Sequence, residues 1–306
     1  MNASLGARLM RNIRKYWFIY MLALPGLIYT IVFRYFPMYG ILLAFKDYRP
    51  RKGIWGSEWV GLQHFRELFS DSYFLQVIWN TVLINIYGIV FGFTFTVFLA
   101  LMLNELRSNK LKRTLQTVVY LPNFLSWVIF GGIIILFLSP TEGMVNEIIK
   151  LFGGEGKYFL IEPDYFRTIV TVTNIIKNAG FGTIIYLASL AGIDPQLYES
   201  AVIDGAHRGH MLLHITIPSI LPTIAVMLLL NLASLFNANF EQIYILYNPL
   251  VYETGDVIPT YLYRMGLEEG EYELSTAVSL VFNVFGLITL VIANKIINRL
   301  NVVGIV

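Results

Sequence analysis

The sequence predicts an all-α integral membrane protein with six transmembrane helices. Of its 306 residues, 56% are hydrophobic and only 14% are charged, whereas soluble proteins carry about 25% charged residues. Six apolar runs each approach or exceed the ~20 residues that cross a bilayer as a helix. No repeat or domain boundary interrupts them, so we expect a single transmembrane domain over residues 1–306. The absence of cysteine excludes disulfides, thiolate metal sites and a cysteine nucleophile.

The six predicted spans cover, in order, residues 16–43, 76–103, 114–138, 166–190, 220–247 and 275–298. The first span follows Arg8, Arg11, Arg14 and Lys15, a layout that signal peptides share. The run is too long for a signal peptide and lacks a cleavage site of small residues, so we expect an uncleaved span. In the third span, Pro122 is expected to kink or start the helix.

Basic residues orient the spans. The loop 104–113 holds Arg107, Lys110, Lys112 and Arg113, and such a cluster resists translocation, so we expect this loop in the cytoplasm. Both termini and the segment 191–219 then lie in the cytoplasm, while the segments 43–75 and 139–165 are external. Apolar residues at helical spacing over 62–69 predict an amphipathic helix in the first external segment, lying on the membrane or on protein.

The segment 191–219 is a polar interruption with two helix signals. Asp194 followed by Pro195 predicts a helix start, and Gly205 predicts a stop, because glycine adopts the left-handed conformation that ends helices. A second helix is expected over 206–217, closed by Pro218. Two short helices joined at a glycine corner between membrane spans suggest a rigid element that a partner pushes.

This stretch resembles the cytoplasmic loop of permease subunits from carbohydrate ABC importers. That loop carries Glu-Ala-Ala, then Asp-Gly-Ala, and later Ile-x-Leu-Pro. The matching residues here are Glu199, Ala201, Ile203, Asp204, Gly205, Ala206, Ile215 and Pro218. The chain departs from the pattern at Ser200, Leu212 and Ile217, all of them small or apolar replacements. Further segments, 174–188 and 256–267, are similar to the branch that imports complex oligosaccharides and polysaccharide fragments.

The resemblance implies a partner for each function that this chain lacks. One permease pairs with a second, related permease, two ATP-hydrolysing subunits lie below, and an external binding protein delivers the sugar at a bacterial cytoplasmic membrane. ATP and magnesium would bind the ATPases, so no cofactor is expected on this chain. The string Gly153 to Lys157 lacks the upstream glycine of a Walker motif and has Tyr158 where Ser or Thr is needed, so this chain is not expected to be an enzyme.

The resemblance implies that the stretch Glu199–Pro218 lies in a groove of the ATPase. The expected coupling residues are Tyr198, Glu199, Ser200, Ala201, Ile203, Asp204, Gly205, Ala206, Ile215 and Pro218. Independently, the carboxylates of Glu199 and Asp204 suit a basic partner, and the apolar residues on the same helix suit the centre of an interface. Pro218 is expected to separate this element from the fifth span.

Polar residues inside the predicted spans suggest a sugar pathway, because polar groups are costly in a membrane and usually face a cavity. Sugars are bound by hydrogen bonds to their hydroxyls and by aromatic rings against their C–H faces. The candidates are Asn174, Lys177 and Asn178 on the fourth span, and Phe236, Asn237, Asn239, Phe240, Glu241, Gln242 and Tyr244 on the fifth. The simpler interpretation is that several of them only bond to neighbouring helices or to the second permease.

Some alternatives stay open. Lys177 and Arg34 suggest an acidic sugar, although Lys177 could pair with Glu241 instead. His207, His210 and His214 have spacing that zinc sites use, but surface or partner-facing histidines are the favoured interpretation. The rival function is a self-contained secondary transporter, which usually shows internal repeats and an ion site at mid-membrane.

Overall fold

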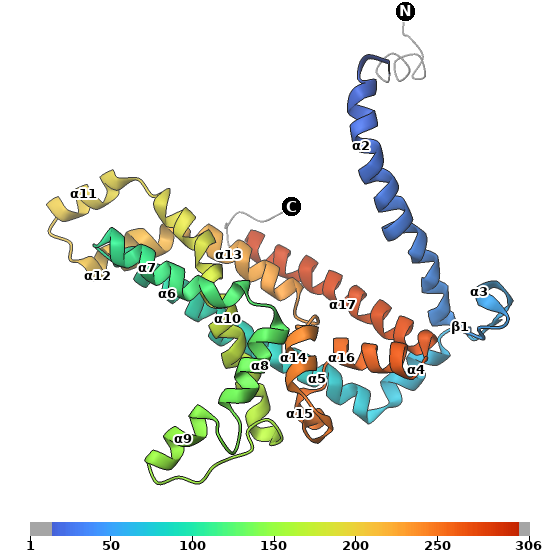
Figure 1. Cartoon of the computed structure of the whole chain (residues 1–306). Helices are drawn as coiled ribbons and strands as arrows, with labels where there is room; N and C mark the ends of the chain where they lie inside the picture. The colour runs from blue at the N-terminus through green and yellow to red at the C-terminus, as the bar shows by residue number, and fades with distance from the viewer. Residues whose placement is uncertain (1–13, 300–306) are drawn as a thin grey trace, which may run out of the picture.

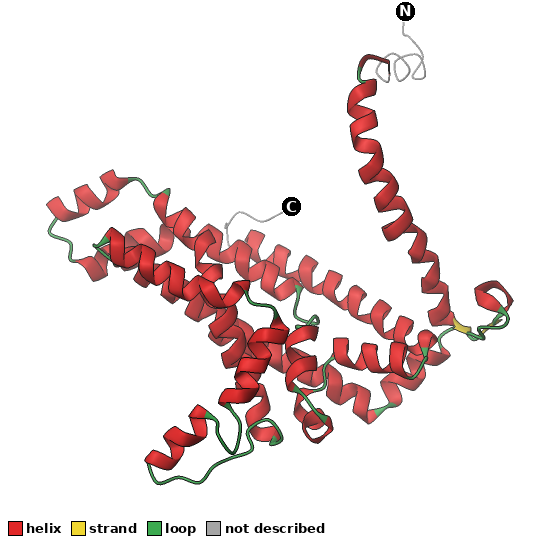
Figure 2. Cartoon of the chain, viewed as in Figure 1, coloured by secondary structure: helices red, strands yellow, loops and turns green. Residues whose placement is uncertain are grey.

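The computed structural model describes residues 14–299, which are mostly helical (Figures 1 and 2). Four helices in this part are long and apolar enough to cross a membrane: Trp17–Phe45, Ser72–Glu105, Arg208–Ala233 and Tyr272–Ile296. Two bent pairs raise the number to six if each pair is one span: Asn109–Phe124 with Trp127–Phe137, and Pro163–Ala191 with Pro195–Ile203. The predicted helical membrane class is therefore confirmed, with four to six candidate spans. Arg8 and Arg11 lie outside the described residues.

The α-helices follow one another with short connections. They are α2 (Trp17–Thr30), α3 (Gly53–Gly56), α4 (Gln63–Ser70), α5 (Ser72–Tyr87), α6 (Thr94–Glu105), α7 (Asn109–Tyr120), α8 (Trp127–Phe137), α9 (Met144–Leu151), α10 (Pro163–Ala191), α11 (Pro195–Ile203), α12 (Arg208–Met211), α13 (Ile217–Ala233), α14 (Phe240–Leu246), α15 (Tyr252–Gly255), α16 (Ile258–Tyr263) and α17 (Tyr272–Arg299). Wider or tighter helical turns extend α2 to Phe45, join α5 to α6 and α12 to α13, and extend α16 to Glu268. The strands β1 (Lys46–Asp47) and β2 (Glu58–Trp59) pair antiparallel.

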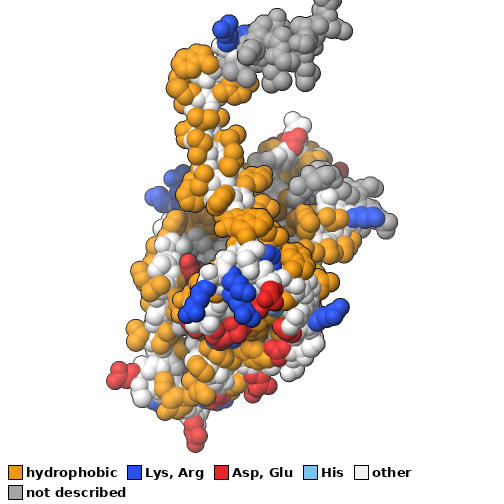
Figure 3. Space-filling model, turned by 90° about the vertical axis from the view of Figure 1, so that its right-hand side faces the viewer, with side chains coloured by type: hydrophobic (Ala, Val, Ile, Leu, Met, Phe, Trp, Pro, Cys, Tyr) orange, Lys and Arg blue, Asp and Glu red, His pale blue; other side chains and the backbone are white. Residues whose placement is uncertain are grey.

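The first helical rod, α2 with its extension to Phe45, diverges from the other helices (Figure 1). The apolar window of this rod is 0% buried within the chain, and only its last part, Phe36–Phe45, packs against α17 and α4. Its visible surface is apolar along most of its length (Figure 3). A helix that is apolar all round belongs in lipid or between protein surfaces.

α10 is the central helix, in contact with α5, α6, α7, α13, α14 and α15. Its approach to α7 depends on Gly180, because a Cβ added there would lie 1.9 Å from the carbonyl oxygen of Val119. Only glycine permits such a close backbone approach. α10 therefore holds the other helices at fixed positions and carries three of the predicted pathway residues.

The helix that follows the polar interruption runs without a break from Arg208 to Ala233, so the prediction that Pro218 closes a helix is wrong. Within this continuous helix, the residues Leu212–Thr216 form a π-helical turn directly before α13. This wider turn shifts the hydrogen-bonding register, so that Pro218 falls in the first turn of α13, where no backbone donor is needed. Pro218 therefore does not separate the polar interruption from the fifth span; it lies inside one continuous rod.

The predicted fifth span 220–247 is not one helix either, because α13 ends at Ala233 and α14 starts at Phe240. Asn239 caps the N-terminus of α14, its side chain accepting a hydrogen bond from the backbone N–H of Gln242 at 3.1 Å. Short polar side chains such as Ser234, Asn237 and Asn239 compete with the backbone of a helix and favour such breaks. Hydropathy alone continues across the interruption, which is why the sequence predicted one span.

The third span is also broken. The helices Asn109–Phe124 and Trp127–Phe137 meet at 101°, so the predicted kink near Pro122 is confirmed. The predicted amphipathic helix is confirmed as α4, and it lies on protein: His64 and Leu68 are buried and α4 packs on α17 and α5.

Candidate functional site

α11 begins and ends where the sequence predicts. The side chain of Asp194 accepts a hydrogen bond from the backbone N–H of Gln196 at 2.9 Å, and Pro195 occupies the first turn. This N-cap satisfies a donor that the helix leaves free, which stabilises a short helix by about 1 kcal/mol. α11 projects at one end of the molecule, beyond α7 (Figure 1).

Gly205 forms the corner after α11. Its φ is +78°, a conformation in which side-chain-bearing residues are disfavoured. The N–H of Gly205 donates to the carbonyl of Val202 at 3.1 Å, and the N–H of Ala206 donates to that of Ala201 at 2.9 Å. These two bonds are the paired bonds of a Schellman cap, so the corner has a defined geometry.

The outer surface of α11 has no partner within the described residues. No residue of this helix is buried, and the side chain of Ile203 is 85% exposed. Leu197 and Val202 are also exposed, as are the carboxylates of Glu199 and Asp204. An apolar group of this kind with anionic neighbours matches the centre and rim of a protein interface.

One side chain of α11 connects it to the rod Arg208–Ala233. The hydroxyl of Tyr198 lies 2.9 Å from the hydroxyl of Thr216, which is buried. The Thr216 hydroxyl also reaches the carbonyl of Met211 at 3.4 Å, inside the π-helical turn. The predicted coupling residues Ile215 and Pro218 lie on this rod, so the contact of Tyr198 joins α11 to the element that carries them.

The three histidines stay on the surface. His207 caps α12, with its Nδ1 accepting from the N–H of His210 at 3.2 Å, and the rings of His210 and His214 stack 4.0 Å apart. Among the residues described, no group of three or more His, Cys, Asp or Glu side chains could hold a metal ion.

Two small polar cavities lie beside α10, the first against α5, α13 and α14 and the second against the turn Gly88–Phe93, α6 and α13. The first, about 130 Å³, is lined among others by Asn85, Asn174, Asn231, Asn239 and Gln242. The second, about 180 Å³, shares Asn174 and Asn231 and adds Asn178. The structure thus brings together four of the predicted pathway residues, Asn174, Asn178, Asn239 and Gln242. Asn231 and Ser234 were not predicted, because single polar residues in an apolar run give no sequence pattern.

A larger cavity of about 630 Å³ lies between α13, α16 and α17. Its lining includes the predicted Phe236 and Asn237, together with Ser279 and Asn283 of α17. The lining of this cavity therefore offers both apolar rings and polar groups. Phe236 also packs against Phe282, 5.9 Å between ring centroids, so it belongs to the core as well.

The remaining pathway candidates on α14 differ in whether they are buried against α10 or exposed. Gln242 is 1% exposed; it accepts from Asn174 at 3.1 Å and donates to the Val170 carbonyl at 2.7 Å. It therefore fixes α14 on α10. Glu241 is exposed, and Tyr244 is 40% exposed.

Lys177 is buried, 4% exposed, and its ammonium group holds the break in the third span. It donates to the carbonyls of Pro122 and Asn123 at 3.1 Å each, and to that of Leu125. An ammonium has three protons, so these carbonyls use all of them. The ring of Trp127 lies beneath it, 5.3 Å away. Lys177 therefore satisfies backbone groups that a broken helix leaves free. The pairing with Glu241 and the contact with cargo stay predictions.

Replacing Lys177 by methionine is expected to lower the free energy of unfolding by about 3 kcal/mol, because buried carbonyls lose their donor. Thermal unfolding in detergent checks this, with Lys150→Met as the control, since Lys150 pairs with Glu147 on the exposed surface of α9. If Lys177→Met kept wild-type stability and lost only the uptake of acidic sugars, the lysine would be a cargo contact instead.

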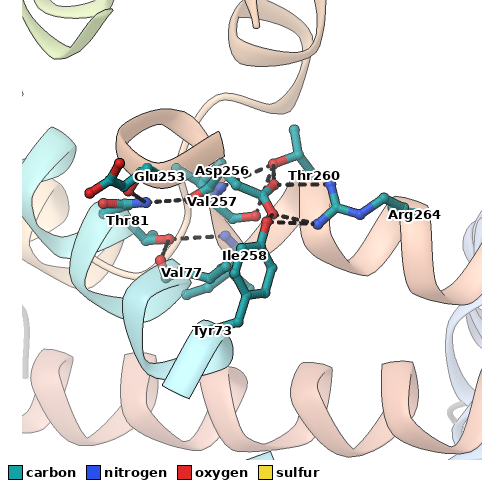
Figure 4. Close-up of polar contacts among 10 residues, drawn as sticks. Tyr73, Val77, Thr81, Glu253, Asp256, Val257, Ile258, Thr260 and Arg264 are labelled. Atoms are coloured by element: carbon teal, nitrogen blue, oxygen red, sulfur yellow. Dashed lines mark hydrogen bonds and ion pairs between the residues drawn. The ribbon is translucent and has the colours of Figure 1, made fainter. Parts of the chain in front are cut away.

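A buried charge network holds the segment 248–268 to α5 (Figure 4). Asp256 is 0% exposed; Arg264 donates to it at 2.5 Å and Thr260 at 2.8 Å, and the hydroxyl of Tyr73 donates to the same carboxylate. Burial alone would lower the pKa of Arg264, but the hydrogen bond and charge of Asp256 raise it above its ordinary value. The guanidinium also lies 4.6 Å from the ring of Tyr252.

Asparagine and arginine extend this network. Asn80 donates to the carbonyls of Glu253 and Asp256, and Arg167 donates to the side chain of Asn80 at 2.7 Å. The sequence showed Asp256 and Arg264 only as part of a resemblance. Their pairing with Tyr73, at a separation of 183 to 191 residues, carries no sequence signal.

Known proteins match this chain over most of its length. The family described as "binding-protein-dependent transport system inner membrane component" matches residues 92–302. In Bacillus subtilis (strain 168), protein LplB is 39% identical and the match covers 100% of this chain and 96% of the relative. The polygalacturonan/rhamnogalacturonan transport system permease protein YteP of the same organism is 40% identical, with 97% and 93% covered.

Solved structures agree with these relatives. A chain of a bacterial ABC transporter involved in import of the acidic polysaccharide alginate is 42% identical, with a TM-score of 0.89 and coverage of 95% of this chain and 99% of that one. A chain of the bacterial alginate ABC transporter in complex with an alginate-pentasaccharide-bound periplasmic protein is 41% identical, with a TM-score of 0.91 and coverage of 97% and 100%. This chain belongs to the family of inner membrane components of binding-protein-dependent transport systems.

Proposed function

We propose that this chain is a permease subunit of an ABC importer for oligosaccharides or polysaccharide fragments in a bacterial cytoplasmic membrane. The observation that carries the proposal is the geometry of α11. A capped, exposed helix with a defined glycine corner is joined through Tyr198 and Thr216 to a rod that ends beside polar cavities. Relatives that import alginate and polygalacturonan support the class of cargo.

The proposed partners fit surfaces that this chain leaves uncovered. α11, with Ile203 at its end, is the proposed contact for one of two ATP-hydrolysing subunits. The rod Trp17–Phe45, whose most apolar stretch is 0% buried in this chain, is a proposed contact for the second permease. The external binding protein is supported by the solved relative that holds a periplasmic protein. Both termini and the segment 191–219 are proposed to be cytoplasmic.

The proposed mechanism follows the continuous rod. ATP-driven closure of the ATPases moves α11, and its corner at Gly205 and its bond to Thr216 pass the motion to Arg208–Ala233. The rod ends at Ala233, where the break 234–239 lies against the polar cavities. A rigid helix that moves one end of a packed cavity can switch its access from one side to the other. Pro218, lying inside the rod, does not interrupt this path.

An acidic cargo is proposed from the relatives, because neither cation that first suggested it lines the cavities described above. Lys177 is engaged by backbone carbonyls, and Arg34 lies on the diverging first rod. Recognition of the carboxylates would therefore fall to the binding protein or to the second permease, while this chain supplies neutral hydrogen-bonding groups such as Asn174 and Asn237.

Expression of this chain together with the genes that lie next to its own gene tests the proposal. We expect the tagged chain to co-purify with a second permease and an ATPase. In proteoliposomes with the binding protein, ATP should drive uptake of uronic oligosaccharides. Purification of the chain alone, with sugar uptake driven by an ion gradient, would instead indicate a secondary transporter.

A further inference from the structure

Five aromatic side chains form a continuous surface row outside the cavities described above. The row starts at Phe240, whose ring lies 5.1 Å from that of Tyr244 and 5.2 Å from that of Tyr263. Tyr244 and Tyr263 are themselves 5.1 Å apart. From Tyr244 the row continues to Tyr247 at 5.9 Å, and from Tyr247 to Tyr252 at 5.1 Å.

This aromatic row differs from the aromatic groups of the core by its exposure. Tyr244 is 40% exposed, and the other four side chains are half-buried. By contrast, Phe74 and Tyr261, a ring pair in the core, are 0% and 4% exposed. Rings that only fill a core do not keep a free side, so the row presents ring surface to something outside the chain.

The row connects the buried charge network with the break 234–239. One end, Tyr252, belongs to the segment that the buried Asp256 holds to α5, and the guanidinium of Arg264 lies against its ring. The other end, Phe240, directly follows the break at 234–239, where Asn237 and Asn239 are exposed. Phe240 and Tyr263 also line an open cavity of about 460 Å³.

The chemistry of the row suits sugar rings. Four of the five side chains are tyrosines, which combine an apolar ring with a polar hydroxyl at the tip. Arg264, the cation at its end, is paired with Asp256, so the row carries no free charge. It can therefore hold the C–H face of a sugar unit whatever substituent that sugar carries.

We propose that this aromatic row is a track for successive sugar units of a polymeric cargo. The row holds the sugar polymer while the polymer enters between the segment 248–255 and the break 234–239. The track rests on the proposed function, and it adds the preference for cargo of several units. A single sugar covers one or two rings, whereas a longer fragment covers the whole row. The contribution of each ring therefore grows with the length of the cargo.

The test uses the complete importer in proteoliposomes and compares uptake of uronic oligosaccharides of increasing length. Each of Tyr244→Ala and Tyr247→Ala is expected to raise the KM for the longer oligosaccharides roughly two- to tenfold, the value of one aromatic contact, with a smaller effect on the shortest. Tyr247→Phe keeps the ring and loses only the hydroxyl, so its KM should lie closer to the wild-type value than that of Tyr247→Ala. Phe91→Ala removes an exposed ring elsewhere on the chain and should change nothing.

Equal effects on short and long cargo would overturn the track. Loss of the second permease from the purified Tyr244→Ala complex would also overturn it, because the row would then be a contact between subunits. Both results differ from failure of the proposed function, in which the wild-type complex imports no oligosaccharide of any length.

Discussion

Replacing Gly205 by valine is expected to abolish ATP-driven uptake while the protein stays in the membrane. The φ of Gly205 is +78°, although no atom would lie within 4 Å of an added Cβ. The obstacle is therefore backbone conformation and not space: the left-handed region costs an ordinary residue roughly 1–2 kcal/mol, and a β-branched residue more. The Schellman cap would open, and α11 would no longer keep its orientation to the rod Arg208–Ala233.

Gly205→Asn is the matched control, because asparagine tolerates the left-handed conformation and finds the same open space. It should retain most of the uptake. Uptake is measured in proteoliposomes containing the complete importer, and membrane localisation by fractionation and blotting. Wild-type uptake by Gly205→Val would contradict the role given to this corner.

Replacing Arg264 by methionine is expected to destabilise the protein by about 3–5 kcal/mol, the usual cost of leaving one partner of a buried pair alone. Asp256 has no exposure to solvent, and Thr260 and Tyr73 would be its remaining side-chain partners. The segment 248–268 should then detach from α5, and the thermal unfolding temperature in detergent should fall.

The double variant Arg264→Met with Asp256→Asn removes the lone charge and should recover much of that loss, since apolar or neutral replacements of a buried pair are often tolerated. If the double variant were as unstable as Arg264→Met, the loss would come from the packing of the arginine against Tyr252 and not from its charge. The comparison therefore separates the two contributions.

The capping of α11 was predicted from the sequence because it is local. Asp194, Pro195 and Gly205 act on backbone groups within a few residues of themselves, so their types and spacing carry the information. The membrane class was predicted for a similar reason: a run of ~20 apolar residues has few other uses.

The ends of the fifth helix could not be predicted in the same way. Pro218 lies inside the rod because a π-helical turn precedes it, and nothing in the residue pattern announces such a turn. Apolar residues on both sides of the break 234–239 gave one continuous run of hydropathy, although Asn239 starts a separate helix.

The sequence by itself determined that this chain is a helical membrane protein with a short capped helix between Asp194 and Gly205, because hydropathy and capping are properties of neighbouring residues. Tertiary structure alone decided which polar groups are free. In the folded chain, Lys177 donates to three backbone carbonyls at the break in the third span, and Asp256 accepts from Tyr73 and Arg264. Tertiary structure also aligned five rings into one row, from α14 and the residue directly after it, from α15 and from α16. Partners far apart in the chain meet only when the helices pack, so their pairing is decided by the fold.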